Sequence, residues 1–300
     1  MTLTSHPPAL PLVREVLDRI TAYLAVKGVD SPRLSAEVLL AHALGVERQD
    51  ILLAKDRPLA PSEEDRAVAL AKRRGTGEPV AYIVGEKEFY GLAFEVTPDT
   101  LIPRPETEHL IEHALNCFPE DAEVRFTDLG CGSGALAVAF GVERKRALGM
   151  ALDISEAALA ITRKNILRHG LDQRVTAVAG DFSMLPCPDA SLDLVLANPP
   201  YVPRAEYQGL SREILDFEPQ LAFLPPQYEN NGLAAYTAII PEAARVLKPG
   251  GVLLMEMGCS QGQAVLSLAR SRRGEWEETS ISKDLAGLDR MLVAVRSCGK

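Results

Sequence analysis

The sequence predicts an α/β protein in which a small helical bundle is followed by a mostly parallel β-sheet. Two observations support this fold class. From about residue 104 to residue 296, short apolar runs typical of strands alternate with stretches typical of helices. The first 75 residues instead place their apolar side chains at helical spacing. Strands separated by helices indicate a sheet that is covered on both faces.

The composition is that of an ordinary globular protein. The chain has 300 residues, of which 47% are apolar and 24% are charged, and this length predicts about two domains. The formal net charge of −9 disfavours long nucleic acid as the main partner, because phosphate binding usually shows as a basic excess. The sequence contains neither an apolar run typical of a transmembrane helix nor a signal peptide, so we expect no membrane association.

The cysteines show no metal or disulfide pattern. They are scattered along the chain without a Cys-x-x-Cys pair, at Cys117, Cys131, Cys187, Cys259 and Cys298. This spacing is not that of a zinc site, and the odd count does not indicate a disulfide framework. We therefore expect no metal and a reducing, cytoplasmic environment.

The first predicted elements are helices. Helical spacing runs through residues 12–24 and 34–44, which predicts a small bundle of the kind that serves as a packing or docking module. Residues 76–103 change character. They contain two apolar and aromatic runs between glycines, 81–84 and 89–96, and this pattern predicts a β-hairpin that links two domains.

The rest of the chain alternates strands and helices. Strands are predicted at residues 124–129, 148–152, 175–179, 192–197, 252–256, 276–280 and 291–295. Helices are predicted at residues 135–142, 156–168, 232–246 and 261–270. Lys248-Pro249-Gly250-Gly251 is a helix-stop and turn signal. Residues 199–231 form a proline-rich connection whose length is typical of a lid or binding loop, with a solvated insertion as the alternative.

A glycine-rich turn joins the first strand of the predicted sheet to a helix. It consists of Gly130, Cys131, Gly132, Ser133 and Gly134. Glycines let a backbone approach a ligand closely, and open α/β sheets bind ligands at the carboxyl ends of their strands. Asp153 ends the next strand, where an acid can accept hydrogen bonds from two ribose hydroxyls. The turn also satisfies the dinucleotide fingerprint, and it is compatible with a tight strand–helix connection alone.

Asp128, two residues before Gly130, favours a different cofactor. A carboxylate suits the ammonium group of a methionine moiety and repels a pyrophosphate. The pattern Asp-x-Gly-x-Gly-x-Gly therefore resembles the cofactor loop of class I methyltransferases that use S-adenosylmethionine. Asp181 and Phe182 follow the third strand, where such enzymes place an acid on the adenine amino group and an apolar side chain beside the ring. A turn residue and a core aromatic are the alternatives at these two positions.

The most specific feature is Asn198-Pro199-Pro200-Tyr201, after the fourth strand. Each proline fixes its own φ and holds the preceding residue out of the α region, which makes a rigid corner rich in carbonyls. This corner suits a planar nitrogen with two hydrogens: Asn198 accepts one, the Pro199 carbonyl accepts the other, and Tyr201 stacks on the plane. The nitrogen lone pair then faces an electrophilic methyl group, and no general base is required in advance. A plain turn is the alternative.

With these features the chain resembles the protein-(glutamine-N5) methyltransferases that modify bacterial peptide chain release factors, the HemK/PrmC family. The resemblance covers nearly the whole chain, helical bundle included. Further matching motifs lie at residues 82–85, 89–96, 101–108, 218–219, 232–236 and 256–261. One departure is visible. The family often has Gly-Gly-x-x-Gly before the helix at 232, whereas this chain has Tyr228-Glu229-Asn230-Asn231-Gly232.

The resemblance implies a class I methyltransferase (Rossmann-like) fold with a mostly parallel seven-stranded sheet. It divides the chain into a recognition bundle at residues 1–75, a hairpin linker at 76–103 and a methyltransferase domain at 104–300. The implied cofactor is S-adenosyl-L-methionine, with S-adenosyl-L-homocysteine as product. The implied partner is a release factor, methylated at the glutamine of its Gly-Gly-Gln motif. We expect a monomer without stable nucleic-acid binding.

The resemblance also assigns roles to individual residues. The implied cofactor-binding residues are Gly130, Cys131, Gly132, Ser133, Gly134, Asp153, Asp181, Phe182 and Asn198. The implied substrate-binding residues are Asn198, Pro199, Pro200 and Tyr201. Of these, Asn198, Pro199 and Tyr201 would be catalytic. Phe89 and residues 104–108 would close the cofactor pocket.

Four other functions remain open at this point. The sister family methylates a glutamine of a ribosomal protein, but its segment matching residues 104–108 typically departs from the sequence found here. Adenine-N6 methyltransferases share Asn-Pro-Pro-Tyr because adenine presents a planar exocyclic amine, although the charge of −9 disfavours nucleic acid. A non-catalytic cofactor-binding module is disfavoured by the intact Asn198 and Tyr201, and a nicotinamide oxidoreductase by Asp128.

Overall fold

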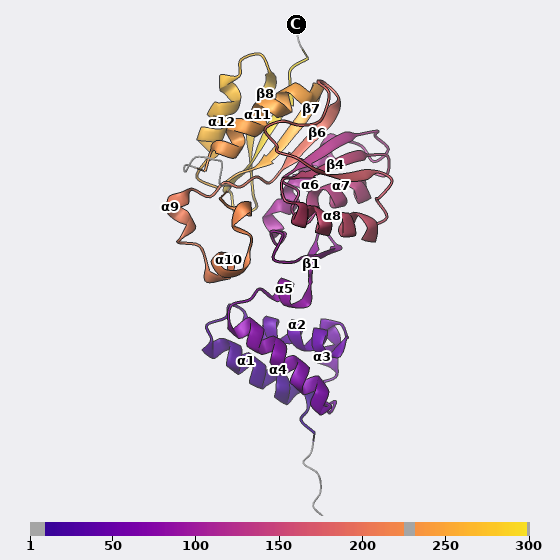
Figure 1. Ribbon diagram of the computed structural model, residues 1–300, viewed down its shortest axis with the longest axis vertical. Helices are drawn as coiled ribbons and strands as arrows, with labels where there is room; N and C mark the ends of the chain where they lie inside the picture. Colours follow the sequence, from indigo (N-terminus) through magenta and orange to yellow (C-terminus); the bar gives the residue numbers. More distant parts are fainter. Residues whose placement is uncertain (1–9, 225–231, 299–300) are drawn as a thin grey trace, which may run out of the picture. The chain divides into compact units, whose positions relative to one another are not determined.

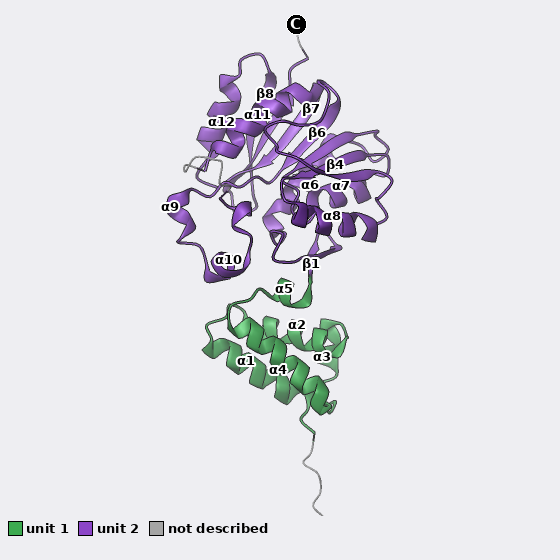
Figure 2. Ribbon diagram, in the orientation of Figure 1, with its two compact units in different colours: residues 1–85 green, residues 86–300 purple. Residues whose placement is uncertain are grey.

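The structure is a computed structural model that describes residues 10–224 and 232–298. It divides into two compact units, Met1–Gly85 and Glu86–Lys300 (Figure 2). The division falls inside the segment expected as a linker, so residues 76–85 belong to the first unit and residues 86–103 to the second.

The first unit is helical. Its helices among the described residues are α1 (Val13–Val26), α2 (Pro32–Leu44), α3 (Arg48–Leu53), α4 (Pro61–Gly75) and α5 (Val80–Val84). They enclose one apolar core, to which α1 contributes Leu17 and Leu24 and α2 contributes Leu39 and Leu40, all fully buried. The predicted helices at residues 12–24 and 34–44 are confirmed.

Residues 81–84 were expected in a strand and instead form helix α5. Pro79 precedes the helix, and its carbonyl accepts hydrogen bonds from Tyr82 N and Ile83 N. Gly85 ends the helix with a φ of +78°, a conformation that glycine adopts without strain. Tyr82 and Ile83 are adjacent and both buried, which a single face of a strand would not permit. The prediction of a strand here was therefore wrong.

The second apolar run does form a hairpin. Strands β1 (Glu86–Phe89) and β2 (Leu92–Glu95) pair antiparallel around Tyr90 and Gly91, both of which have positive φ. Phe89 and Phe94 are buried in the core of the second unit and meet edge to face, with ring centroids 6.1 Å apart. The hairpin is therefore part of the second unit.

Within the described residues the second unit holds one seven-stranded sheet, in the order β5-β4-β3-β6-β7-β9-β8. Figure 1 labels β4, β6, β7 and β8 of this sheet. The strands are β3 (Arg125–Leu129), β4 (Leu148–Asp153), β5 (Val175–Ala179), β6 (Leu192–Ala197), β7 (Leu247–Glu256), β8 (Trp276–Lys283) and β9 (Asp289–Arg296). Strands β3 to β7 run parallel, and β9 and β8 complete the sheet antiparallel. The predicted mostly parallel seven-stranded sheet is confirmed.

Helices cover both faces of this sheet. On one face α6 (Glu108–Cys117), α7 (Ala135–Glu143) and α8 (Glu156–Arg168) pack over Leu194 and Leu196. On the other, α11 (Ala234–Val246) and α12 (Gly262–Ser271) pack over Val195 and Ala197. Residues of β6 thus alternate between two apolar cores, as the pleat of a buried strand requires.

The stop signal at residues 248–251 occupies an unexpected place. Helix α11 ends at Val246 as predicted, but β7 begins at once with Leu247 and contains these four residues. Leu192 pairs with Leu247 and Leu194 pairs with Val252, so the pairing register between β6 and β7 shifts across these four residues.

The long connection after β6 contains short helices. They are α9 (Arg204–Tyr207), α10 (Arg212–Phe217) and the 3₁₀ turn η2 (Gln220–Ala222). A further 3₁₀ turn, η1 (Pro105–Thr107), leads into α6. The departure from the family pattern at residues 228–231 lies outside the described residues.

Gly149 in β4 offers a test of the sheet packing. It pairs with Phe126 of β3, and a Cβ at this position would lie 2.2 Å from Phe126 Cζ. Because that ring is buried in the core, Gly149→Ala should lower the free energy of unfolding by about 1–3 kcal/mol. Denaturant unfolding would measure the loss. In a Phe126→Leu background the same substitution should cost clearly less, and an equal cost in both backgrounds would contradict the explanation.

Candidate active site

Three predicted site segments meet at one edge of the sheet. The order β4-β3-β6 brings the carboxyl ends of these parallel strands together, because Leu129 pairs with both Leu152 and Ala197. The glycine turn follows β3, Asp153 ends β4, and Asn198 follows β6. The strand order reverses between β3 and β6, and open α/β sheets bind ligands at such a point.

The glycine turn has a backbone that favours glycine. Gly132 has a φ of +55°, and Gly134, at the start of α7, has a φ of +81°. A Cβ at Gly134 would lie 2.9 Å from Thr162 Cγ2, so a side chain would also collide with α8. Gly130 N and Cys131 N both donate to Leu152 O, which ties the turn to the end of β4. The Cys131 side chain is buried.

Two buried side chains of α8 donate hydrogen bonds to carbonyl oxygens of the turn. Thr162 Oγ1 donates to Gly132 O at 2.8 Å, and Asn165 Nδ2 donates to Ser133 O at 2.8 Å. Asn165 also exchanges hydrogen bonds with the backbone N and O of Glu95 in the hairpin. The sequence does not single out either residue, because one Thr or Asn within a helix carries no local signal of the loop that it will contact.

Asp153 connects the turn to β4. Its Oδ2 accepts from Gly132 N and its Oδ1 from Ser155 N, each at 2.9 Å. Burial raises the pKa of Asp153, while these backbone hydrogen bonds oppose the rise. Each carboxylate oxygen has two acceptor sites, so these bonds leave capacity for further donors.

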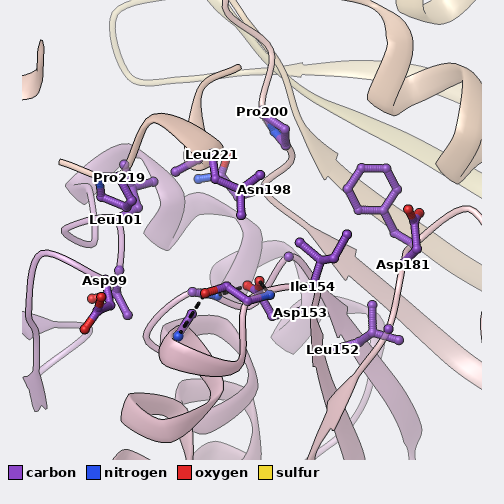
Figure 3. A pocket seen from close by; sticks show the side chains of 18 residues that line it. Asp99, Leu101, Leu152, Asp153, Ile154, Asp181, Asn198, Pro200, Pro219 and Leu221 are labelled. Atoms are coloured by element: carbon purple, nitrogen blue, oxygen red, sulfur yellow. Dashed lines mark hydrogen bonds between the residues drawn. The ribbon is translucent and has the colours of Figure 1, made fainter. Parts of the chain in front are cut away.

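A cavity opens over these segments. It has an empty volume of about 790 Å³, a figure that includes open solvent. Its lining includes Gly130, Gly132, Asp153, Asp181, Phe182, Asn198 and Pro200 (Figure 3). Leu101, Pro219 and Leu221 line it as well. Residues from four strand ends are thus brought to one cavity.

Asp181 and Phe182 lie where β5 ends. Asp181 Oδ1 accepts from Ser183 N at 2.8 Å, which is the contact expected of a turn residue. Both residues line the cavity as well, and Phe182 is half-buried against the core that α11 and α12 cover. The turn contact and the cavity wall therefore coexist.

Asp128 lies in a smaller neighbouring cavity. This cavity shares Gly130, Gly132 and Asn198 with the larger one. Asp128 is almost fully buried, and its Oδ2 accepts from Ala137 N at 3.0 Å. Burial raises the pKa of this carboxyl to about 7, and the nearby Asp153 adds to the rise. A cation in the cavity would favour the ionised form.

Asn198 is held by a chain of buried polar groups. Asn198 Nδ2 donates to Thr107 Oγ1 at 3.0 Å, and Thr107 Oγ1 donates to Glu256 Oε2 at 2.7 Å. The hydroxyl of Tyr201 donates to Glu256 Oε1 at 3.3 Å. Burial raises the pKa of Tyr201, so its hydroxyl remains a donor at neutral pH. Glu256, at the end of β7, thus receives hydrogen bonds from two separate segments.

The backbone of Tyr201 has its own support. Gln261 Nε2 donates to Tyr201 O at 2.9 Å and to Gly232 O at 3.2 Å. Gln261 Oε1 accepts from the buried Tyr236 hydroxyl and from Gly258 N. A Cβ at Gly232 would lie 2.5 Å from Tyr201 O, which explains why glycine stands there.

The loop after β6 is attached to the segment before α6. The buried carboxylate of Glu218 accepts from Ile102 N and pairs with Arg104. This attachment lies beside Leu101 and Pro219, both on the cavity wall. Phe89 was expected to close the pocket, but its ring is buried against Phe94 in the core.

Residues 10–224 and 232–298 contain no group of three or more His, Cys, Asp or Glu side chains arranged to hold a metal ion. In the same residues, no helix combines the length and apolar character needed to cross a membrane.

Comparison with known proteins identifies both units. Residues 15–85 match the family described as "PrmC N-terminal domain", and residues 120–278 match the family described as "Methyltransferase domain". Among solved structures, a methyltransferase from Pyrococcus furiosus is 18% identical with a TM-score of 0.50, covering 70% of this chain and 92% of that one. At this identity the likeness concerns the fold, and the predicted class I methyltransferase fold is confirmed.

Curated relatives match over nearly the full length. A "Release factor glutamine methyltransferase" from Nitratidesulfovibrio vulgaris is 49% identical over 98% of this chain and 97% of its own. Proteins of the same name from Moorella thermoacetica and Geobacter sulfurreducens are 40% and 39% identical, over 95% and 96% of this chain and 98% of each of their own. The chain therefore belongs to the family of release factor glutamine methyltransferases.

Proposed function

We propose that this protein transfers a methyl group from S-adenosyl-L-methionine to the side-chain amide nitrogen, N5, of the glutamine in the Gly-Gly-Gln motif of peptide chain release factors. Family membership supports the reaction and the substrate class. The observation that carries the proposal is the placement of Asn198 on the cavity at the switch point of the sheet.

The geometry around Asn198 suits a carboxamide. Because its Nδ2 donates to Thr107, its Oδ1 is available to accept an N–H from the substrate. We assign the second N–H to the carbonyl of Pro199, which is an acceptor. Tyr201 stacks on the amide plane. These contacts hold the plane of the substrate amide and direct its nitrogen toward the cofactor.

The cavity residues fit the proposed cofactor by their chemistry. Asp128 and the turn at residues 130–134 provide a carboxylate and backbone for the methionine end. Asp153 would accept hydrogen bonds from the ribose, and Asp181 with Phe182 would bind the adenine side. When bound, S-adenosyl-L-methionine supplies an electrophilic methyl group on a sulfonium. These acids suit a cationic ligand, because each is a hydrogen-bond acceptor with negative charge when ionised.

The chain's own residues contribute mainly position and polarity to the reaction. The lone pair of an amide nitrogen is delocalised, so orienting it against the methyl group is the main assistance available. Asn198 and the Pro199 carbonyl keep both hydrogens in place while the new N–C bond forms. One hydrogen leaves as a proton after transfer, so no base is needed before the methyl moves.

We assign recognition of the release factor to the first unit, since residues 15–85 match the family's own N-terminal domain. The hairpin at residues 86–95 belongs to the catalytic unit. We expect the protein to act as a monomer in the cytoplasm, where release factors function, without stable binding of nucleic acid.

A methylation assay with labelled cofactor tests the proposal. Purified protein should label a release factor at one glutamine, and a release factor with Gly-Gly-Ala in place of Gly-Gly-Gln should stay unlabelled. Ribosomal proteins and duplex DNA serve as the competing substrates. Robust labelling of either one, with none of any release factor, would assign the chain to the ribosomal-protein or adenine-N6 alternative.

Asn198→Ala separates catalysis from cofactor binding. The variant should lose methyl transfer by at least about 100-fold, because the substrate amide loses an acceptor in a buried site. Calorimetry should show cofactor affinity within about threefold of wild type. Asn116→Ala, at an exposed position of α6, is the matched control and should keep full activity. A large loss of cofactor affinity in Asn198→Ala would show that the role of Asn198 is misassigned.

The raised pKa of Asp128 predicts a pH-dependent cofactor affinity. With a pKa of about 7 in the free protein, Asp128 is about half ionised at pH 7 and about one-tenth ionised at pH 6. A bound cation favours the carboxylate, so binding releases a proton and the cofactor Kd should rise about fivefold between pH 7 and pH 6. Titration calorimetry at the two pH values measures this change.

Asp128→Asn should bind the cofactor more weakly at pH 7 and lose most of this pH dependence. Asp172→Asn, at an exposed position, should keep the wild-type profile. If the cofactor Kd of Asp128→Asn changed with pH as much as that of the wild type, the titrating group would be a residue other than Asp128.

A further inference from the structure

Thr107 lies between a carboxylate that accepts its hydroxyl hydrogen and an amide group that donates to its oxygen. Its Oγ1 is 2.7 Å from Glu256 Oε2 and 3.0 Å from Asn198 Nδ2. Both Thr107 and Glu256 are buried, with exposed fractions of 5% and 2%. Thr107 and Glu256 therefore depend mainly on protein hydrogen-bond partners, and those partners determine where the hydrogens lie.

The Glu256 carboxylate determines which group donates and which accepts in this series of hydrogen bonds. An ionised Glu256 has no hydrogen and accepts only, so the Thr107 hydroxyl donates to it. The Thr107 oxygen then offers only lone pairs to Asn198, so Asn198 donates to it through its NH₂ group. Although burial raises the pKa of Glu256, the hydroxyls of Thr107 and Tyr201 and the charge of Arg290 all favour the carboxylate.

We infer that Thr107 and Glu256 are positioning residues that determine which way the Asn198 carboxamide faces. Asn198 donates to Thr107, and Thr107 donates to Glu256. The NH₂ group of Asn198 therefore faces Thr107, and its Oδ1 faces the cavity. The site therefore presents an acceptor to the substrate and selects a target with an N–H donor. This inference rests on the proposed function, because it explains how the site reads the hydrogens of a glutamine amide.

The residues that make these hydrogen bonds come from distant parts of the sequence. Thr107 belongs to η1, before α6, whereas Glu256 ends β7. Tyr201 Oη also donates to Glu256, so one carboxylate orients Asn198 and holds the aromatic ring three residues later. Removal of that carboxylate should disturb both contacts that the substrate amide requires.

Substitution of Thr107 provides the first test. Thr107→Val keeps the shape of the side chain and removes its hydroxyl. The Asn198 amide then loses the acceptor that orients it, so kcat for release-factor methylation should fall about 10- to 100-fold. Thr107→Ser restores the hydroxyl and should recover kcat to within about threefold of wild type. Cofactor Kd should stay within about twofold in both variants. Thr237→Val, at an exposed position of α11, is the matched control with wild-type kcat.

Glu256→Gln provides the second test. A carboxamide offers both a donor and acceptors, so it no longer dictates the direction of the Thr107 hydroxyl, and kcat should fall to a similar extent. The double variant Thr107→Val, Glu256→Gln should be little worse than either single variant, because both act through the orientation of Asn198. A merely structural role would instead give additive losses and lower the melting temperature and the cofactor affinity together.

The outcomes separate the two proposals. Failure of the wild-type protein to methylate any release factor would overturn the proposed function. An active wild type whose Thr107→Val variant keeps kcat within twofold would overturn the positioning role alone. Equal losses in Thr107→Ser and Thr107→Val would do the same, because the hydroxyl would then be irrelevant.

Discussion

The meeting of β3, β4 and β6 at their carboxyl ends is the constraint on which the rest of the site depends. The parallel register places Leu129 beside both Leu152 and Ala197, so the residues that follow these strands converge without any special loop design. Gly132 accordingly reaches the carboxylate of Asp153 through its backbone amide. Reversal of the strand order at this edge leaves room above it, and the cavity occupies that room.

Buried polar side chains then give this edge one conformation. Asn165, Gln261 and Glu218 each connect backbone segments that are far apart in sequence, and each is buried with its hydrogen bonds made. A buried polar group that loses its partner costs about 1–3 kcal/mol, so alternative loop arrangements are strongly disfavoured. The site is therefore rigid because its supporting groups cannot exchange their partners for water.

The sequence predicted what depends on local pattern. Strand periodicity predicted the parallel strands, and Gly130, Asp153 and Asn198 follow or end those strands and line the cavity. Pro199 and Tyr201 are not among the lining residues of the two cavities described above. Residues 81–84 were misjudged because an apolar run fits a strand or a helix, and only burial against the bundle decides between them. The contacts of Thr107 with Glu256 and Asn198 were out of reach, since they join residues 149 and 91 positions apart. Such pairings arise from tertiary packing and leave no mark on local spacing.

The two acceptors at the proposed substrate position suit the charge movement of methyl transfer. In the proposed reaction, positive charge would develop on the amide nitrogen of the substrate. The two N–H groups would then become stronger donors, so Asn198 Oδ1 and the Pro199 carbonyl would bind the transition state more tightly than the substrate. An acceptor whose direction is set in advance by Thr107 and Glu256 gains this energy without reorganising. Catalysis without a general base is thus consistent with a site whose polar groups are already oriented before the substrate arrives.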